Sequence, residues 1–232
     1  MKILLSSILI LLNAFFSPSL WADFSWPTFH HAPGMEIDWT ADRMIYNGMP
    51  MKVENFKCEC SSEELLEYYR KRWEKEKKKV VENTLGQFQQ IAFADRKYFH
   101  AVMVKADSLN ADHTVGRITI SELPNIKQKH YVLGDGVPKA GDSRIVNDVQ
   151  DAMPGKRSRT VLMSNNRTVQ ENTDYYRNYY RSKGWKSYLR PLNEKFGMQA
   201  ISYSHENKDV NIVIHERNGE SHILFNEVTE VR

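Results

Sequence analysis

The strongest constraint on the fold of this chain is an internal repeat of domain size. Residues 61–70 follow the pattern S-x-x-E-x-x-x-Y-Y-R, and residues 168–177 follow T-x-x-E-x-x-x-Y-Y-R, at an offset of 107 residues (168 − 61). Two further echoes flank this match: Met-Pro-x-Lys at 49–52 and 153–156, and a strand-like run at 91–104 and 201–214. These offsets exceed the roughly 20 to 50 residues of solenoid repeats. The sequence therefore predicts two homologous units, although the repeat names no reaction.

The N-terminal segment has the features of a secretory signal peptide. Residues 1–22 contain one cation at Lys2, an apolar stretch at 3–16 and a cut site after Ala22, which is the order typical of such signals. An uncleaved membrane anchor is the alternative, but the apolar run is shorter than the roughly 20 residues of a membrane span. We therefore expect secretion across the inner membrane and a cleaved, periplasmic product that is not an integral membrane protein.

Composition narrows the class of protein. Lysine and arginine number 32 against 29 aspartate and glutamate, and loss of Lys2 leaves 31 against 29 (32 − 1). This balance gives no reason to expect nucleic acid as a partner. The basic tract at 70–79 could bind nucleic acid or lipid headgroups, but we interpret it as a solvated helix end. Two cysteines are too few for the disulfide framework on which small secreted domains rely.

Removal of the signal leaves a first unit at 23–127 and a second at 128–232, joined at a stretch rich in glycine and proline, 134–138. Each unit is expected to open with a loose lead-in. A short strand follows, at 52–58 or 159–164, and then a helix and an antiparallel meander of about four strands. The sequence therefore predicts an α+β fold, a tandem duplication of a strand–helix–meander unit with one helix packed on each antiparallel sheet.

Both helices begin with the same local signal. Ser61 with Glu64, and Thr168 with Glu171, form capping boxes that satisfy free backbone N–H groups at a helix start. Gly184 is a typical left-handed stop for the second helix, whereas the first lacks such a stop and could continue into its lysine-rich end. An apolar stripe at spacings of 3 and 4 is predicted to face the sheet: Leu66, Tyr69 and Trp73 in the first helix, and Val169, Thr173, Tyr176 and Tyr180 in the second.

The last hairpin can be placed residue by residue. Asn218-Gly219 predicts a type I′ turn that pairs Arg217 with Glu220, and a second turn is expected at 207–208. That second turn would pair Ile201 with Ile214. The resulting core face is apolar at six positions in each unit: Ile201, Tyr203, Ile212, Ile214, Ile223 and Phe225, with Ile91, Phe93, Val102, Val104, Ile118 and Ile120 as their counterparts.

His215 and His222 are one candidate metal-binding pair. The hairpin makes them cross-strand neighbours, close enough to share an ion. In the first unit the aligned residues are Lys105 and Arg117, and no third ligand is evident. We therefore interpret the two histidines as surface residues.

Cys58 and Cys60 are the second candidate pair. They could act in redox chemistry or bind Cu(I) together with nearby His30, His31, Met35, Met44, Met49 and Met51. In an extended strand their α-carbons would lie roughly 6.5 to 7 Å apart, so a disulfide would require a bend. The second unit has Asn165 and Arg167 at these positions, and we interpret the cysteines as two thiols at a strand end.

The repeated Tyr-Tyr-Arg triplets are the features that both units share most closely. Tyr69 and Tyr176 should face the sheet, and a structural role is the simpler explanation for the whole triplet. Tyr68, Arg70, Tyr175 and Arg177 are the candidate interaction surface.

No catalytic motif is present: the sequence contains no phosphate-binding loop, nucleophile elbow or His-Glu-x-x-His run. We therefore expect no enzymatic activity and no cofactor. The predicted function is that of a binding or adaptor protein of a bacterial envelope assembly, with an unknown envelope protein as partner. The alternatives are a carrier of small apolar ligands in a helix-grip cavity, or copper or redox handling through Cys58 and Cys60.

Overall fold

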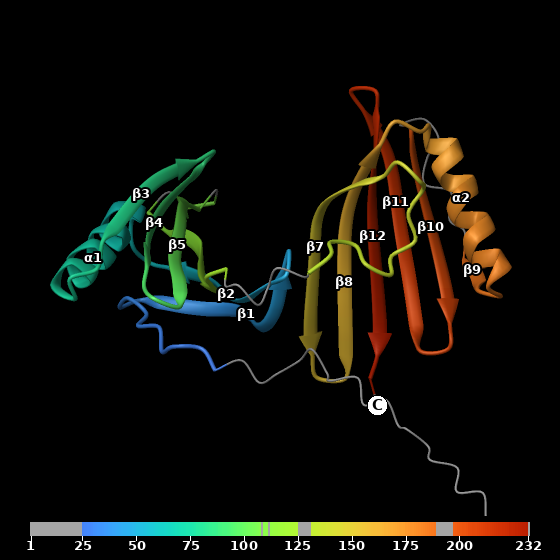
Figure 1. Ribbon diagram of the computed structural model, residues 1–232. Helices are drawn as coiled ribbons and strands as arrows, with labels where there is room; N and C mark the ends of the chain where they lie inside the picture. The colour runs from blue at the N-terminus through green and yellow to red at the C-terminus, as the bar shows by residue number, and fades with distance from the viewer. Residues whose placement is uncertain (1–24, 108, 111, 125–130, 189–196, 232) are drawn as a thin grey trace, which may run out of the picture.

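The computed structural model describes residues 25–107, 109–110, 112–124, 131–188 and 197–231. The predicted signal at 1–22 lies outside these residues. The described chain consists mostly of antiparallel sheet with two helices (Figure 1), which confirms the predicted α+β class. No helix in this part of the chain is long and apolar enough to cross a membrane.

The two halves of the chain contain the same succession of elements. The first half comprises β1 (Met35–Tyr46), β2 (Met49–Cys58), α1 (Ser62–Lys75), β3 (Val80–Leu85), β4 (Phe88–Ala94), β5 (Tyr98–Ala106) and β6 (Thr114–Glu122). The second half comprises β7 (Arg144–Met153), β8 (Lys156–Asn165), α2 (Val169–Ser182), β9 (Lys186–Tyr188), β10 (Met198–His205), β11 (Lys208–Arg217) and β12 (Glu220–Glu230).

β1 and β7 lie where the sequence predicted loose lead-ins, so that prediction was wrong. β1 has register shifts between Ile37 and Trp39 and between Ala41 and Met44, and β7 has one just after Ile145. Each shift breaks the alternation of apolar and polar residues from which a strand is recognised in sequence. The strand prediction therefore fails where the strands are bulged.

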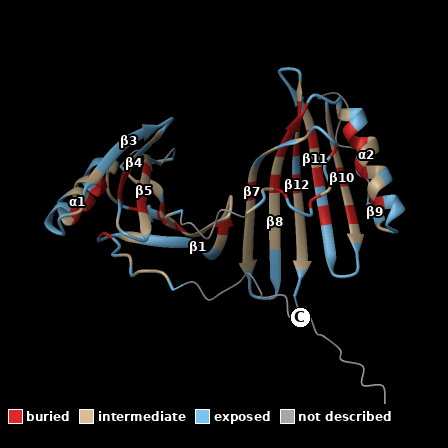
Figure 2. Ribbon diagram, viewed as in Figure 1, coloured by how far each residue is buried: buried red, intermediate tan, exposed pale blue. Residues whose placement is uncertain are grey.

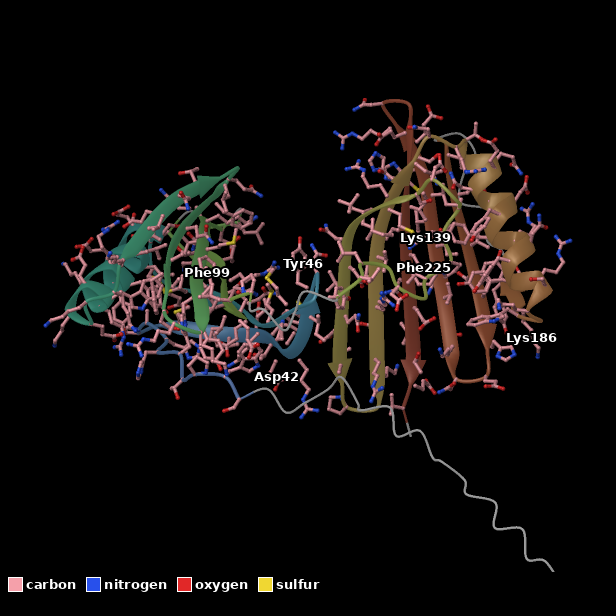
Figure 3. The ribbon with its side chains drawn as sticks, viewed as in Figure 1. Asp42, Tyr46, Phe99, Lys139, Lys186 and Phe225 are labelled. Atoms are coloured by element: carbon pink, nitrogen blue, oxygen red, sulfur yellow. A yellow bond between two sulfur atoms is a disulfide. The ribbon has the colours of Figure 1, made fainter. Side chains whose placement is uncertain are left out.

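All described strands belong to one sheet, in the order β3-β4-β5-β6-β2-β1-β7-β8-β12-β11-β10-β9. The halves meet where the end of β1 pairs antiparallel with β7, over Met44–Tyr46 and Val149–Asp151. Tyr46 marks this junction in Figure 3. Outward from the junction, the strand order is the same in both directions.

Register confirms one predicted hairpin and corrects the other. β11 and β12 pair as expected, with Arg217 opposite Glu220, and Asn218 and Gly219 both have the positive φ of a type I′ turn. The turn between β10 and β11 lies at 206–207, one residue earlier than predicted, because His205 pairs with Lys208, and this moves the pairing register by two residues. Ile201 therefore faces Ile212 instead of Ile214. A shift of two residues leaves the core face unchanged, since side chains alternate with a period of two.

The structure also corrects two of the sequence alignments between the halves. Val102 pairs with Ile118, and Ile212 pairs with Phe225, so Ile118 corresponds to Phe225, and the predicted match of Ile118 with Ile223 was wrong. The two Met-Pro echoes are not equivalent either. The first Met-Pro pair follows the turn 47–48, whereas the second straddles the start of the turn 154–155.

Both helices begin at the predicted capping boxes. Ser61 and Thr168 are the N-caps, and each side chain accepts a hydrogen bond from the backbone N–H of its glutamate, Glu64 or Glu171. Hydrogen bonds from the backbone and the side chain of the capping residue hold the pKa of each glutamate below its usual range. α1 ends at Lys75, within the basic tract at 70–79, and does not continue through the lysines at 77–79.

Each half has its own buried cluster (Figure 2). In the first half the cluster joins α1 to β4, β5 and β6, and includes Leu66, Tyr69, Trp73, Ile91, Phe93, Val102 and Ile118. In the second half it joins α2 to β8, β10, β11 and β12, and includes Met163, Tyr176, Tyr180, Ile201, Tyr203, Ile212, Ile214, Ile223 and Phe225. Of the residues predicted to face the sheet, Leu66, Tyr69, Trp73, Tyr176 and Tyr180 belong to these clusters. Val169 packs against the second cluster, and Thr173 is buried outside it.

A buried ion pair lies beside the junction of the halves. Asp148, on β7, is fully buried. It accepts hydrogen bonds from both the Nε and Nη2 atoms of Arg159, at 3.0 and 2.6 Å, and from the backbone N–H of Gly134 at 2.8 Å. The backbone of Asp148 also exchanges hydrogen bonds with Asn47, in the β1–β2 turn. One carboxylate therefore links β7, β8 and the 134–138 joint at the point where the first half is attached.

Candidate interaction surface

The second tyrosine of each Tyr-Tyr-Arg triplet is part of the core. Tyr69 and Tyr176 are 0% and 1% exposed. The Tyr69 hydroxyl accepts a hydrogen bond from the backbone N–H of Ala32 at 3.2 Å and lies 3.3 Å from the carbonyl oxygen of His30. Burial raises the pKa of both phenols well above the usual range. Both tyrosines pack their helix into the core cluster of its half. In the first half, Tyr69 also connects α1 to the segment at 30–32.

The other triplet residues make intramolecular contacts. Tyr68 and Tyr175 are partly buried against the two core clusters. Arg70 donates to both oxygens of Glu82 on β3, at 2.7 and 3.0 Å, and also pairs with Glu67. Arg177 pairs with Asp174 on its own helix. Packing accounts for these four residues, and their use as an interaction surface stays a prediction.

His215 and His222 are cross-strand neighbours, as predicted. Their rings are stacked, with centroids 5.2 Å apart and planes 16° apart. Within the described residues, no group of three or more histidine, cysteine, aspartate or glutamate side chains could hold a metal ion. Strand register corrects their first-half counterparts to Lys105 and Val115. The metal site stays without a third ligand.

Cys58 and Cys60 form a disulfide, so the interpretation as two thiols was wrong. Their α-carbons are 5.2 Å apart, closer than in an extended strand, because the chain bends at Glu59 before it enters α1. Cys58 is buried. In this state neither sulfur can donate a thiolate to Cu(I), which removes the softest ligands from the proposed copper set.

We expect the disulfide to contribute little to stability. It closes a loop of only three residues, so the Cys58→Ser, Cys60→Ser variant should lose about 1–2 kcal/mol of the free energy of unfolding. Urea unfolding of the two proteins measures this difference. Titration of the unfolded wild type with a thiol reagent, without reductant, should find no free thiol; two reactive thiols in the native-source protein would contradict the disulfide.

One face of the second half carries an unexpected row of apolar side chains. Leu162 pairs with Leu224, Leu224 pairs with Val213, and Val213 pairs with Ala200. These four residues, which we call the apolar row, alternate along their strands with core residues and therefore point away from α2. Leu224 is 42% exposed.

Polar residues, with Met198 as the one exception, bound the apolar row on both sides. One neighbouring row contains Ser164, His222, His215 and Met198, and the other contains Thr160, Asn226, Asn211 and Ser202. Asn226 donates to Thr160 at 2.9 Å, and Ser202 donates to Asn211 at 2.7 Å. The result is a narrow apolar strip with a polar rim, which is the usual layout of a protein interface.

The first half shows that the fold does not require the apolar row. Met103 follows the core residue Val102, as Val213 follows Ile212, and Arg117 precedes Ile118, as Leu224 precedes Phe225. The corresponding first-half row is Asn55, Arg117, Met103 and Gln90. Arg117 donates to Asn55 at 3.0 Å across this row. Three of the four residues at this sheet position in the first half are therefore polar, and Met103 is the exception.

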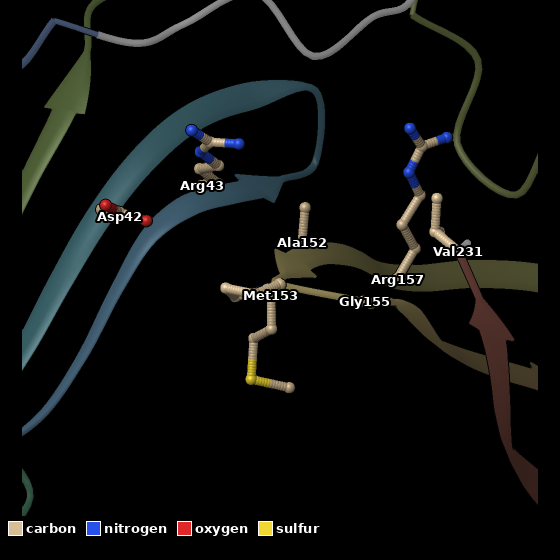
Figure 4. A pocket seen from close by; sticks show the side chains of 8 residues that line it. Asp42, Arg43, Ala152, Met153, Gly155, Arg157 and Val231 are labelled. Carbon is tan, nitrogen blue, oxygen red and sulfur yellow. The ribbon is translucent and has the colours of Figure 1, made fainter.

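A cleft of about 470 Å³ lies near the junction of the halves (Figure 4). It is lined by Asp42 and Arg43 of β1, by the β7–β8 turn, and by Arg157 and Val231. Burial and the charge of Asp42 raise the pKa of nearby Asp151. Both arginines of the cleft have interaction partners within the protein.

The sequence does hold a signal for the apolar row that the sequence analysis did not use. Three consecutive apolar residues occur at 161–163, 212–214 and 223–225, and in each run the middle residue belongs to the row. A run of three interrupts the alternation that a one-sided sheet requires. No protein-family model matches the chain, and no curated protein and no solved structure matches it; the apolar row is accordingly assigned on geometry alone.

Proposed function

We propose that this protein is secreted to the periplasm and acts there, without catalysis, as a binding or adaptor protein of a bacterial envelope assembly. The observation that carries the proposal is the apolar row: four apolar side chains on the sheet surface away from α2, where three of the four corresponding residues of the other half are polar. Export rests on the signal-like N-terminus, and the envelope partner is inferred from that destination.

The same comparison underlies our interpretation of the chain as a tandem duplication, with one helix packed on each half of the sheet. The common order of elements and the shared capping boxes support it. In a duplicated protein, both halves share one fold, so that fold does not require a surface feature that only one half has. The apolar row meets this condition.

The alternative of a ligand carrier receives less support from the geometry. In each half, buried side chains from the helix and the sheet form one cluster in the space between them, and the cleft at the C-terminal end of α1 lies at the edge of that space. A carrier of the helix-grip type would need that space for its ligand.

Site-specific photo-crosslinking in the native cell tests the proposal. A crosslinking residue placed at Leu224 or Val213 should capture one and the same envelope protein. The matched control is Asn178, which is exposed on α2 in the same half. Capture of the same protein from Asn178 with equal yield, or of none from the apolar row, would contradict the proposal.

Leu224→Lys should weaken that partner's binding at least about tenfold, because burial of a leucine side chain stabilises a complex by about 1.5–3 kcal/mol. The free energy of unfolding should change by less than about 0.5 kcal/mol, as is usual for surface substitutions. Binding of the captured protein to purified wild type and variant measures the first effect, and urea unfolding measures the second. Unchanged affinity would show that Leu224 is not part of the interface.

A further inference from the structure

The first half contains a second feature that the adaptor proposal does not use, a cleft of about 390 Å³. It lies between residues 27–30, which precede β1, the C-terminal end of α1, and strands β4 and β5. Its volume is in the range of small-molecule sites. The lining consists of Pro27, Thr28, Phe29, His30, Arg72, Trp73, Glu76, Lys78, Phe93, Asp95 and His100.

The floor of the cleft is aromatic. The Phe93 ring stacks on His100, with centroids 4.4 Å and planes 9° apart. Trp73 meets Phe93 edge-on at 4.7 Å. All three side chains are buried, and the core cluster holds Trp73 and Phe93 from below.

His100 is a polar group in this apolar floor, and only 6% of the residue is exposed. Its Nε2 atom lies 3.3 Å from Oδ2 of Asp95. Asp95 also accepts from the backbone N–H groups of Lys97 and Tyr98, so the turn fixes the carboxylate that orients the imidazole. Burial lowers the pKa of His100 more than Asp95 raises it, which favours the neutral ring.

Two cations, Arg72 and Lys78, and two carboxylates, Glu76 and Asp95, line the cleft. The Lys78 ammonium lies 5.0 Å from the centre of the Phe93 ring, and among the described residues no carboxylate pairs with it. Lys78 is placed there by the turn after α1, where Lys77 has φ +57° and the Lys78 N–H donates to Trp73. Arg72, paired with Glu76 at 3.2 Å, lies on the same rim.

The second half closes the corresponding space. Trp185 stands 107 residues after Lys78 (185 − 78), and its ring meets Tyr180 at 5.0 Å and His205 at 5.4 Å. Val210 replaces His100, because Tyr203 pairs with Val210 as Phe93 pairs with His100. In the second half, Trp185 and Val210 therefore place apolar side chains at this point of the fold. In the first half the same two positions hold the polar residues Lys78 and His100.

We propose that this cleft binds an aromatic carboxylate, either as a free small acid or as the C-terminal aromatic residue of a peptide. The ring lies on the floor formed by Trp73, Phe93 and His100. The carboxylate pairs with Lys78 at the mouth and takes a further hydrogen bond from Arg72. The proposal is independent of the adaptor function, since it concerns the other half of the chain.

Titration of the mature protein, followed by ¹H–¹⁵N NMR, tests the proposal. The probes are 3-phenylpropionate and the peptide Gly-Gly-Phe with a free C-terminus. At least one should cause saturable shifts at the Trp73 indole N–H and around His100; shifts with the acid alone, or with the peptide alone, identify the source. The amide of the same probe should bind at least about tenfold more weakly, because it lacks the charge that pairs with Lys78.

Three variants complete the test. Lys78→Glu should weaken binding at least about tenfold, whereas Lys79→Glu, the same charge change at an exposed neighbour outside the cleft, should leave it unchanged. Lys78→Trp, which copies the second half, should abolish the shifts while the rest of the spectrum shows a folded protein. The proposal is overturned by an absence of saturable shifts with both probes, by equal binding of acid and amide, or by equal losses in the two glutamate variants.

Discussion

Replacement of Asp148 by Asn is expected to lower the free energy of unfolding by about 3–5 kcal/mol, the usual cost of removing one partner from a buried ion pair. The carboxylate is fully buried, and its loss leaves the Arg159 guanidinium without its counter-charge. Equilibrium unfolding in urea measures the difference. Most of the effect should reflect the stranded arginine, so the double variant Asp148→Leu, Arg159→Met should cost less than Asp148→Asn alone.

A matched control is available in the same half. Asp142→Asn removes a carboxylate that pairs with Arg167 at 3.0 Å, but both side chains are about half exposed. Exposed pairs contribute about 0–1 kcal/mol. Equal effects of the Asp142 and Asp148 substitutions would show that the buried ion pair contributes no more to the free energy of unfolding than the exposed one.

The Asp148 pair also predicts a direction for the pH dependence of stability. Burial raises the pKa of the Asp148 carboxyl, but hydrogen bonds from Arg159 and Gly134 and the charge of Arg159 together hold it below the usual range. A depressed folded-state pKa stabilises the protein above the unfolded value of about 3.9, and this stabilisation is lost as the pH falls through the folded-state pKa. The stability difference between wild type and Asp148→Asn should therefore be constant near neutral pH and shrink in acid. A difference that grows in acid would contradict this assignment.

Gly116→Ala is expected to cost at least about 1–3 kcal/mol, the usual effect of overpacking. Gly116 faces Phe56 on β2 and Val104 on β5. An added Cβ would lie 2.3 Å from both the Met103 carbonyl oxygen and the Phe56 ring. The backbone oxygen cannot move without disturbing the β5–β6 ladder, so the strands themselves would have to separate.

Gly141→Ala is the control, because nothing lies within 4 Å of its added Cβ and its φ is not left-handed. Such a site should tolerate alanine or gain stability, by up to about 1 kcal/mol. Urea unfolding of both variants decides the matter. Phe56→Leu should relieve part of the Gly116→Ala cost and leave the part due to the Met103 carbonyl; equal stability of the two alanine variants would refute the close approach.

Local signals explain which elements could be predicted. The capping boxes at Ser61 and Thr168 and the Asn218-Gly219 turn each act within about four residues, so their meaning does not depend on the rest of the fold. The turn near 207 was misplaced because Glu206 adopts a positive φ, a conformation that glutamate seldom adopts. Such a turn has no clear signature in sequence.

The candidate surfaces could be predicted only in part. The cross-strand position of His215 and His222 followed from one hairpin, yet Leu162, Leu224 and Val213 form a row only because β8 pairs with β12 across more than 50 residues of chain. The cleft is formed by residues 27–30, α1 and β5, which are distant in the sequence. Its difference from the second half, Lys78 in place of Trp185, becomes visible once the two halves are compared in space. Pairing over such distances is decided by the whole sheet.

The sequence by itself determined the α+β class, both helix starts, the last hairpin and which face of each meander is buried, because these depend on caps, turn residues and a period of two. Tertiary structure decided the bulged strands β1 and β7, the single sheet across both halves, the bend that joins Cys58 to Cys60, and the Asp148–Arg159 pair. Each of these depends on groups that meet only when distant segments pack, and the free energy of that packing has no local signature in the chain.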